Sequence, residues 1–110
     1  MQDIKVIKRK DSKQFFEGDE QCNLYMKTEK MIFGTSYLEP GRKGTIDLGH
    51  KYGEEIFFVA KGKVMCKFSK VSKKLEEGDA VIIPVGESHK LINKHNEAAL
   101  ICWALAPPDS

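Results

Sequence analysis

Apolar residues fall in short runs along the chain, and charged residues, glycine, proline, aspartate or asparagine interrupt the runs. Helical periodicity is hard to find, and many runs alternate between apolar and polar positions, which is the pattern of antiparallel β-strands. Residues 10–20 fit either a single helical turn or a loop. The pattern predicts strands at residues 4–8, 22–27, 31–38, 44–50, 55–61, 63–69, 80–84, 88–94 and 98–106, with a short one at 71–75.

The segments between these strands read EPGRKG, KYGE, EEGD, PVGE and KHNE, and each is a plausible turn. Strands that recur about every ten residues are typical of a β-sandwich or barrel. The length of 110 residues fits one compact domain. We therefore expect a single all-β domain over residues 1–110, with a frayed C-terminal APPDS.

Charge adds little about partners, because 18 basic and 16 acidic residues leave a formal net charge of +2. Lysines crowd residues 4–13 and 61–74, where they alternate with apolar positions as on the solvated face of strands. No exposed aromatic residues interleave with them, so we expect no nucleic-acid partner.

The three cysteines, Cys22, Cys66 and Cys102, follow no zinc or redox spacing. Their odd number argues against a closed disulfide framework, and free thiols favour a reducing compartment. The stretch MQDIKVIKRK is too polar for a signal peptide, and no apolar run is long enough to cross a bilayer. We expect a cytoplasmic protein without a membrane partner.

Residues 78–93 read GDAVIIPVGESHKLIN. Gly78, Pro84, Gly86, His89 and Asn93 occupy the fixed positions of a motif that resembles the second conserved motif of the cupin superfamily. The local physics agrees with the resemblance, because proline ends a strand and the glycines allow turns on either side of it. The histidine then begins the next strand, where its ring can point into a barrel.

The stretch TIDLGHKYGEEIFFVAKG, residues 45–62, resembles the first cupin motif. Four residues separate His50 from Glu55, and six separate Glu55 from Gly62, which is the spacing of the second motif histidine, the glutamate and the closing glycine. Leu48 stands where the family has its first histidine. A second register places the two histidine positions at His50 and Tyr52 but leaves too short a gap to the glutamate, so we prefer the first register.

The resemblance covers about residues 35–105 and leaves residues 1–20 as an N-terminal strand or arm. Fifteen residues separate the two motifs, a gap similar to that of compact single-domain bacterial and archaeal cupins. The resemblance implies an antiparallel jelly-roll barrel. It also implies a metal inside the barrel, held by three histidines and a glutamate, and a place among dioxygenases, isomerases, decarboxylases and lyases.

The resemblance assigns His50, Glu55 and His89 as metal ligands and leaves the set one histidine short. Two imidazoles and a carboxylate suit iron, manganese, nickel, cobalt or zinc. A three-ligand set also leaves positions open for water and substrate. Strand alternation places Asp47 on the opposite face from His50, so we expect it to point away from the site.

Alternation also predicts the residues that line the pocket beside the ligands. We expect an apolar pocket with a few polar groups, the usual form of a small-molecule site. Asn93 could bond either the barrel backbone or a ligand, and His95 lies in an exposed turn. The predicted lining residues are Ile46, Leu48, Phe57, Val59, Leu91 and Asn93, with Tyr37, Met65 and Trp103 as further candidates.

Three functions stay open from the sequence: a metal-dependent enzyme that acts on a small polar molecule, a binding module for such a molecule, and a structural dimer with a degenerate metal site. No second catalytic base can be placed with the ligands. We expect a homodimer, because the lysine-rich edge strand at 4–8 needs a partner and could extend the sheet of a second copy.

Overall fold

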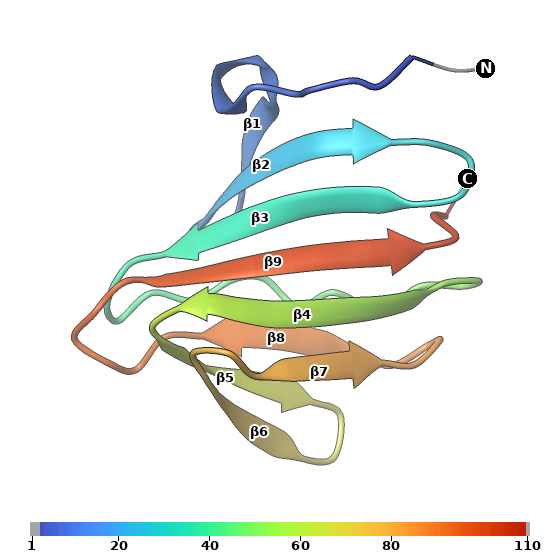
Figure 1. Ribbon diagram of the computed structural model, residues 1–110. Coiled ribbons are helices and arrows are strands. Elements are labelled where there is room, and N and C mark those ends of the chain that lie inside the picture. Colours follow the sequence, from blue (N-terminus) through green and yellow to red (C-terminus); the bar gives the residue numbers. More distant parts are fainter. Residues whose placement is uncertain (1–2, 110) are drawn as a thin grey trace.

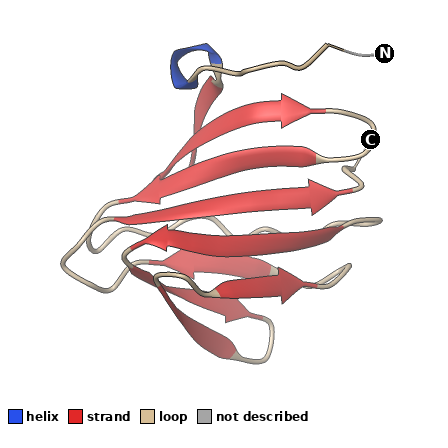
Figure 2. Ribbon diagram, viewed as in Figure 1, coloured by secondary structure: helices blue, strands red, loops and turns tan. Residues whose placement is uncertain are grey.

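The computed structural model describes residues 3–109 and is built almost entirely from β-strands (Figures 1 and 2). A short 3₁₀ turn, η1 (Arg9–Asp11), precedes the first strand. The strands are β1 (Lys13–Glu17), β2 (Glu20–Lys27), β3 (Ile32–Leu38), β4 (Glu54–Lys61), β5 (Lys63–Phe68), β6 (Ser72–Glu76), β7 (Ala80–Ile83), β8 (His89–Ile92) and β9 (Ala99–Ala106).

The strands form two sheets in which all the pairings are antiparallel. One sheet has the order β1-β2-β3-β9-β4-β7, and the other has the order β6-β5-β8. The smaller sheet lies behind the β4 and β7 end of the larger one (Figure 1). The predicted antiparallel jelly-roll fold is therefore confirmed.

The core lies between the sheets and follows from strand alternation. On β4, Glu55, Phe57 and Val59 are buried, while Ile56 and Phe58 between them face outward. Burying an aliphatic or aromatic side chain of this size contributes about 1.5–3 kcal/mol. The other fully buried apolar side chains of the core are Leu38, Val64, Cys66, Ile83, Leu91, Ala99 and Ile101.

Two predicted strands are wrong. Residues 4–8 pair with no strand within the described range 3–109, and their apolar side chains are exposed. The first pairing instead comes from β1, which forms a hairpin with β2. The segment 10–20, expected to be a helical turn or a loop, is therefore mostly strand, and the 3₁₀ turn η1 lies at its start. The segment 44–50 forms no regular ladder: it has one isolated bridge, at Asp47, and a second lies just before it at Lys43.

Within residues 3–109, no helix is long and apolar enough to span a membrane.

Candidate metal centre

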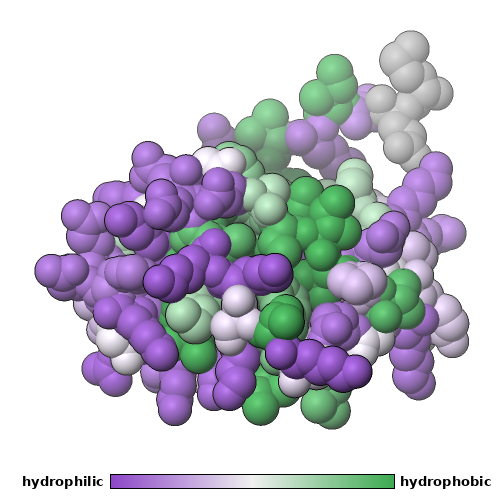
Figure 3. Space-filling model, turned by 90° about the horizontal axis from the view of Figure 1, so that it is seen from below, coloured by the Kyte–Doolittle hydropathy of each residue, from purple (hydrophilic) through white to green (hydrophobic). Residues whose placement is uncertain are grey.

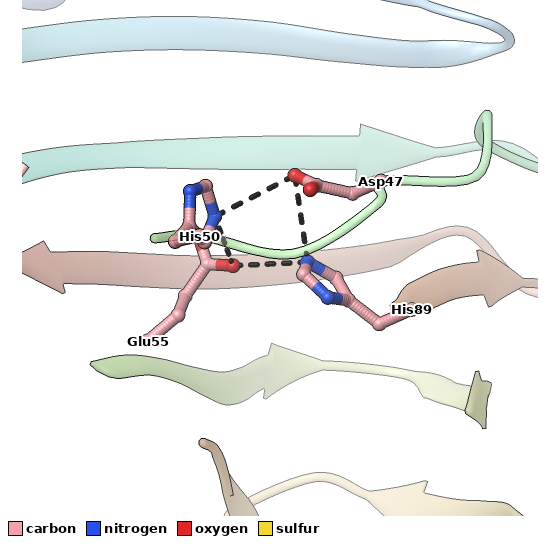
Figure 4. Close-up of side chains that lie close together, drawn as sticks. All are labelled: Asp47, His50, Glu55 and His89. Atoms are coloured by element: carbon pink, nitrogen blue, oxygen red, sulfur yellow. Dashed lines mark hydrogen bonds and ion pairs between the residues drawn. The ribbon is translucent and has the colours of Figure 1, made fainter. Parts of the chain in front are cut away.

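Four side chains converge from three parts of the fold: Asp47 and His50 from the segment before β4, Glu55 from β4 and His89 from β8 (Figure 4). The Nε2 atoms of His50 and His89 lie 3.2 Å and 3.0 Å from Oε1 of Glu55. Both Nε2 atoms lie 3.6 Å from Oδ2 of Asp47. The four donor atoms therefore surround one point.

Backbone pairing positions Asp47 against His89. The Asp47 amide donates to the His89 carbonyl oxygen at 2.8 Å, and the His89 amide donates back at 2.9 Å. Next to this bridge, Gly49 has a φ of +100° and approaches the backbone of Gly86 so closely that a Cβ would lie 2.8 Å from the Gly86 carbonyl carbon. Glycine is therefore required where the segment bends toward the turn before β8.

Each histidine has its Nδ1 atom engaged on the side away from the cluster. Nδ1 of His89 lies 3.0 Å from the carbonyl oxygen of Glu87, and Nδ1 of His50 lies 3.0 Å from Oδ2 of Asp109. Both partners are acceptors, so each Nδ1 carries the proton and donates it. In the neutral ring this tautomer leaves the Nε2 lone pair facing the two carboxylates, as a metal-binding imidazole requires, whereas the protonated ring donates a hydrogen bond from Nε2 to Glu55.

The charges in the cluster favour cations. Desolvation lowers the pKa of His89, but its hydrogen bonds to Glu55 and Glu87 and the charges of Glu55 and Asp47 outweigh it, so the pKa is raised. Desolvation also lowers the pKa of His50, and the hydrogen bond to Asp109 with the same two charges again raises it. The cluster thus favours protonated histidines, whose positive charge offsets the negative charge of the two carboxylates when no metal ion is bound.

The donor set fits a divalent metal ion in both geometry and charge. Ligands bonded at 2.0–2.2 Å stand about 2.8–3.6 Å apart when the angle between them is 90–109°. The four contacts between imidazole nitrogens and carboxylate oxygens span 3.0–3.6 Å. Two carboxylates also supply the two negative charges that neutralise a dication. Metal binding by these residues stays a prediction.

The comparisons with known proteins agree with this architecture. The cupin domain family model matches residues 34–105, which is most of the chain. The chain belongs to the cupin family. No curated protein matches it.

Solved structures similar to this cupin include KdgF from Halomonas sp., with 17% identity, a TM-score of 0.78 and 94% of each chain covered. A predicted oxalate decarboxylase from Thermotoga maritima has 16% identity and a TM-score of 0.81 over 94% of this chain and 99% of that one. A sugar phosphate isomerase from Silicibacter pomeroyi has 14% identity and a TM-score of 0.78 over 93% and 75%. At these identities the likeness shows the fold alone.

The four-residue cluster of this cupin opens into a cavity between the sheets. Phe57 and Leu91 form part of its apolar wall, as predicted from alternation, and so does Trp103, one of the further candidates. Four carboxyl groups also reach the cavity. The remaining lining comes mainly from the β1–β2 hairpin and from β9, and includes Phe15, Glu17, Glu20, Leu24 and Leu105.

Several predicted lining residues lie elsewhere. Ile46 and Leu48 are 62% and 83% exposed, so their prediction is wrong. Val59 is buried in the core and outside the cavity wall. Asn93 is also fully buried, and its Nδ2 donates to the carbonyl oxygens of Leu38 and Glu97, so it bonds the backbone.

Of the further candidates, Tyr37 points outward and Met65 lies outside the cavity wall. His95 is exposed, as predicted.

The prediction for Asp47 is wrong, and the error has a local cause. Alternation applies to a regular strand, but the segment before β4 has only isolated bridges and a left-handed glycine at position 49. Positions 47 and 50 therefore face the same side, and position 48 faces solvent. An acidic residue three positions before the motif histidine was the available signal for this fourth donor.

Proposed function

We propose that this cupin binds a divalent transition metal through Asp47, His50, Glu55 and His89 and is a metal-dependent enzyme acting on a small polar molecule. The reaction would be of the isomerase, lyase or dioxygenase type. The observation that carries the proposal is the convergence of four donor atoms, all within 4.8 Å of one another, at the wall of a cavity.

Two imidazole nitrogens and two carboxylate oxygens suit iron, manganese, nickel, cobalt or zinc. When bound, such an ion would act as a Lewis acid toward an oxygen atom of the ligand. The chain itself would hold the imidazoles in the binding tautomer and exclude bulk water on the side of Phe57 and Leu91. A small, oxygen-rich ligand fits a cavity with apolar walls and a polar end.

The names of two structural neighbours are in keeping with this ligand class. One is a predicted oxalate decarboxylase and another is a sugar phosphate isomerase, and oxalate and sugar phosphates are small, oxygen-rich compounds. The alternative from the sequence is a non-catalytic binding protein with a degenerate metal site. Asp47 weighs against the degenerate site, because it supplies the fourth donor that Leu48 does not.

Elemental analysis tests the metal site on full-length protein purified without a metal-binding tag. We expect near-stoichiometric iron, manganese, nickel, cobalt or zinc in the wild type. His89→Ala should lose the metal, whereas His95→Ala, which removes an exposed histidine, should keep it. A wild type that carries no metal and gains no thermal stability from any of these divalent ions would contradict the proposal.

We also propose that two copies of the chain pair through the outer face of the larger sheet. Phe33 lies beside Ala104, Ala104 beside Ile56, and Ile56 beside Ile82, so an apolar row crosses four adjacent strands. Phe33, Ile56 and Ile82 are 37%, 40% and 65% exposed. Seen from below, the molecule also presents apolar surface between hydrophilic borders (Figure 3).

The N-terminal arm supports the same pairing. Ile4 and Val6 are 98% and 77% exposed, and the arm extends away from the sheets (Figure 1). An apolar segment of this kind could pack on a second copy. A cytoplasmic location is also part of the proposal, because Cys22, Cys66 and Cys102 are all free thiols.

A further inference from the structure

Glu20, the first residue of β2, is a buried acid that the metal centre does not use. Its side chain lines the same cavity as His89 and Glu55, although it lies outside the four-residue cluster. Glu20 is 7% exposed. A carboxyl group is rarely buried to this degree without a specific role or partner, so its surroundings need explanation.

Three neighbouring residues, Trp103, Ser36 and Gly44, determine where the Glu20 carboxyl group lies. Nε1 of Trp103 donates to Oγ of Ser36 at 2.9 Å, and Sγ of Cys22 lies 3.5 Å from the same oxygen. The hydroxyl of Ser36 is close enough to Glu20 to lower the pKa of its carboxyl group. On the other side, Gly44 leaves the space that the carboxyl occupies, because a Cβ there would collide with the carboxyl oxygen. The group is therefore held in place before any ligand binds.

The environment of Glu20 keeps both protonation states accessible near neutral pH. Burial raises its pKa, the hydrogen bond from Ser36 lowers it, the charges of Glu17 and Glu55 raise it and that of His89 lowers it, with a result of about 7. The thiol of Cys22 on the same strand has a pKa raised by burial to about 12 and stays neutral. A general acid or base works best when its pKa is close to the working pH.

The geometry points to Glu20 as the acid–base residue of the cavity, exchanging a proton with an uncharged hydroxycarbonyl compound bound between it and the metal centre. This inference rests on the proposed function, since it takes the metal centre as the place where the ligand oxygens bind. It adds the proton-transfer group that could not be placed from the sequence.

The charged residues that line the cavity determine which class of ligand it favours. Four carboxyl groups, those of Glu17, Glu20, Asp47 and Glu55, reach the cavity. Among the described residues, Lys90 is the only lysine or arginine in the lining. A bound dication would offset only the two carboxylates of the metal centre. The cavity therefore disfavours a phosphate dianion and favours a neutral ligand with adjacent hydroxyl and carbonyl groups.

The proposed step transfers one proton and needs no oxidant. The Glu20 carboxylate removes the proton from the carbon that bears the hydroxyl group next to the carbonyl. The electron pair of that C–H bond forms a C=C bond, and the carbonyl π pair moves to its oxygen, which gives an enediolate. The protonated Glu20 then returns its proton to the original carbon, which restores the ligand, or to the former carbonyl carbon. In the second case the proton of the original hydroxyl group passes to the former carbonyl oxygen, so that the new carbonyl group forms at the original carbon and the ligand is isomerised.

Deuterium exchange tests this step with simple hydroxycarbonyl compounds as probes. Metal-loaded full-length protein is incubated in D₂O with glyceraldehyde, dihydroxyacetone and erythrulose, and NMR measures deuterium at the carbon next to the carbonyl. We expect exchange in the wild type and a loss of about 100-fold or more in Glu20→Gln, the usual contribution of a general base. Glu77→Gln, in an exposed turn, is the matched control and should exchange at the wild-type rate.

Metal content is measured in each sample to separate the two proposals. Wild-type protein that binds no metal contradicts the proposed function. Metal-loaded wild type that exchanges none of the three probes, or Glu20→Gln that exchanges as fast as wild type, overturns the role of Glu20 and leaves the metal site standing. If Glu20→Gln does not fold, Glu20→Asp is used, and a rate and pH profile identical to wild type would overturn the role.

Discussion

The side chain of Asp109 ties the C-terminal tail to the candidate metal centre through His50. Oδ2 of Asp109 accepts from Nδ1 of His50 at 3.0 Å, and Oδ1 accepts from the amide of Lys51 at 3.1 Å. The hydrogen bond from His50 also lowers the pKa of Asp109. The tail, expected from the sequence to fray, instead sets the tautomer of His50, a candidate metal ligand.

Asp109→Ala should therefore weaken metal binding without removing a ligand. Loss of a carboxylate that orients a ligating histidine typically lowers metal affinity about 10–100-fold. Competition with a chromophoric chelator measures the affinity, and Asp11→Ala, which changes an exposed acid in η1, is the control. An affinity equal to that of the wild type in Asp109→Ala would show that the tail contact has no part in the site.

Asp47, and not position 48, should supply the fourth ligand. Asp47→Ala leaves two imidazoles and one carboxylate at the site. We expect weaker metal binding, because one positive charge of a bound dication would then have no carboxylate to neutralise it. Leu48→His restores the histidine of the family motif in sequence, but the side chain at this position is 83% exposed. We expect Leu48→His to bind the metal no more tightly than wild type. Calorimetric titration that showed tighter binding would contradict the assignment.

These residues also show what the sequence could and could not predict. Motif spacing identified three residues of the cluster, because they occupy fixed positions beside turns: His50, Glu55 and His89. The strands followed from alternation and turn residues, whereas the jelly-roll class followed from the resemblance to the two cupin motifs. Asp47 was missed because its orientation depends on a left-handed glycine and on isolated bridges to another strand.

Glu20 and Asp109 were missed for a different reason. Both reach the site through contacts between residues far apart in the chain. The β1–β2 hairpin has to pack over the barrel before Glu20 can line the cavity, and the tail has to fold back before Asp109 meets His50. Local periodicity carries no information on such contacts. The pattern on β2 did hold one signal, since Glu20, Cys22 and Leu24 share a face.

Glu20 should also make stability fall as pH rises. Its pKa is about 7 in the folded protein against an ordinary 4.5, so the folded state binds more protons between these values. The stability that this proton provides is fully present below pH 4.5 and is lost as pH rises through 7. The loss amounts to about 2–3 kcal/mol between pH 5 and pH 8.

Urea denaturation of metal-free wild type and Glu20→Gln at both pH values measures this effect. The amide cannot ionise, so the free energy of unfolding of Glu20→Gln should rise relative to wild type by that amount at the higher pH. Glu77→Gln serves as the control for a general change in charge. If the free energies of unfolding of wild type and Glu20→Gln differed by the same amount at both pH values, Glu20 would have the same pKa in the folded and the unfolded protein.

The outer apolar row should hold two copies together. Ile56 lies at the centre of the row, between Ala104 and Ile82, and Ile56→Glu would bury an unpaired carboxylate if this face were covered. Sedimentation equilibrium should show a wild-type mass twice that of the chain. We expect Ile56→Glu to raise the dimer dissociation constant at least about tenfold, which is 1.4 kcal/mol.

Two further variants complete this test. Val71→Glu changes an apolar residue that is 52% exposed but lies outside the row, and it should leave the dimer intact. Deletion of residues 1–9 removes the arm that carries Ile4 and Val6, and it should weaken the dimer if the arm packs on the second copy. An unchanged dimer after this deletion excludes the arm, while a monomeric wild type excludes the pairing altogether. The row would then be an exposed apolar surface without a second copy to cover it.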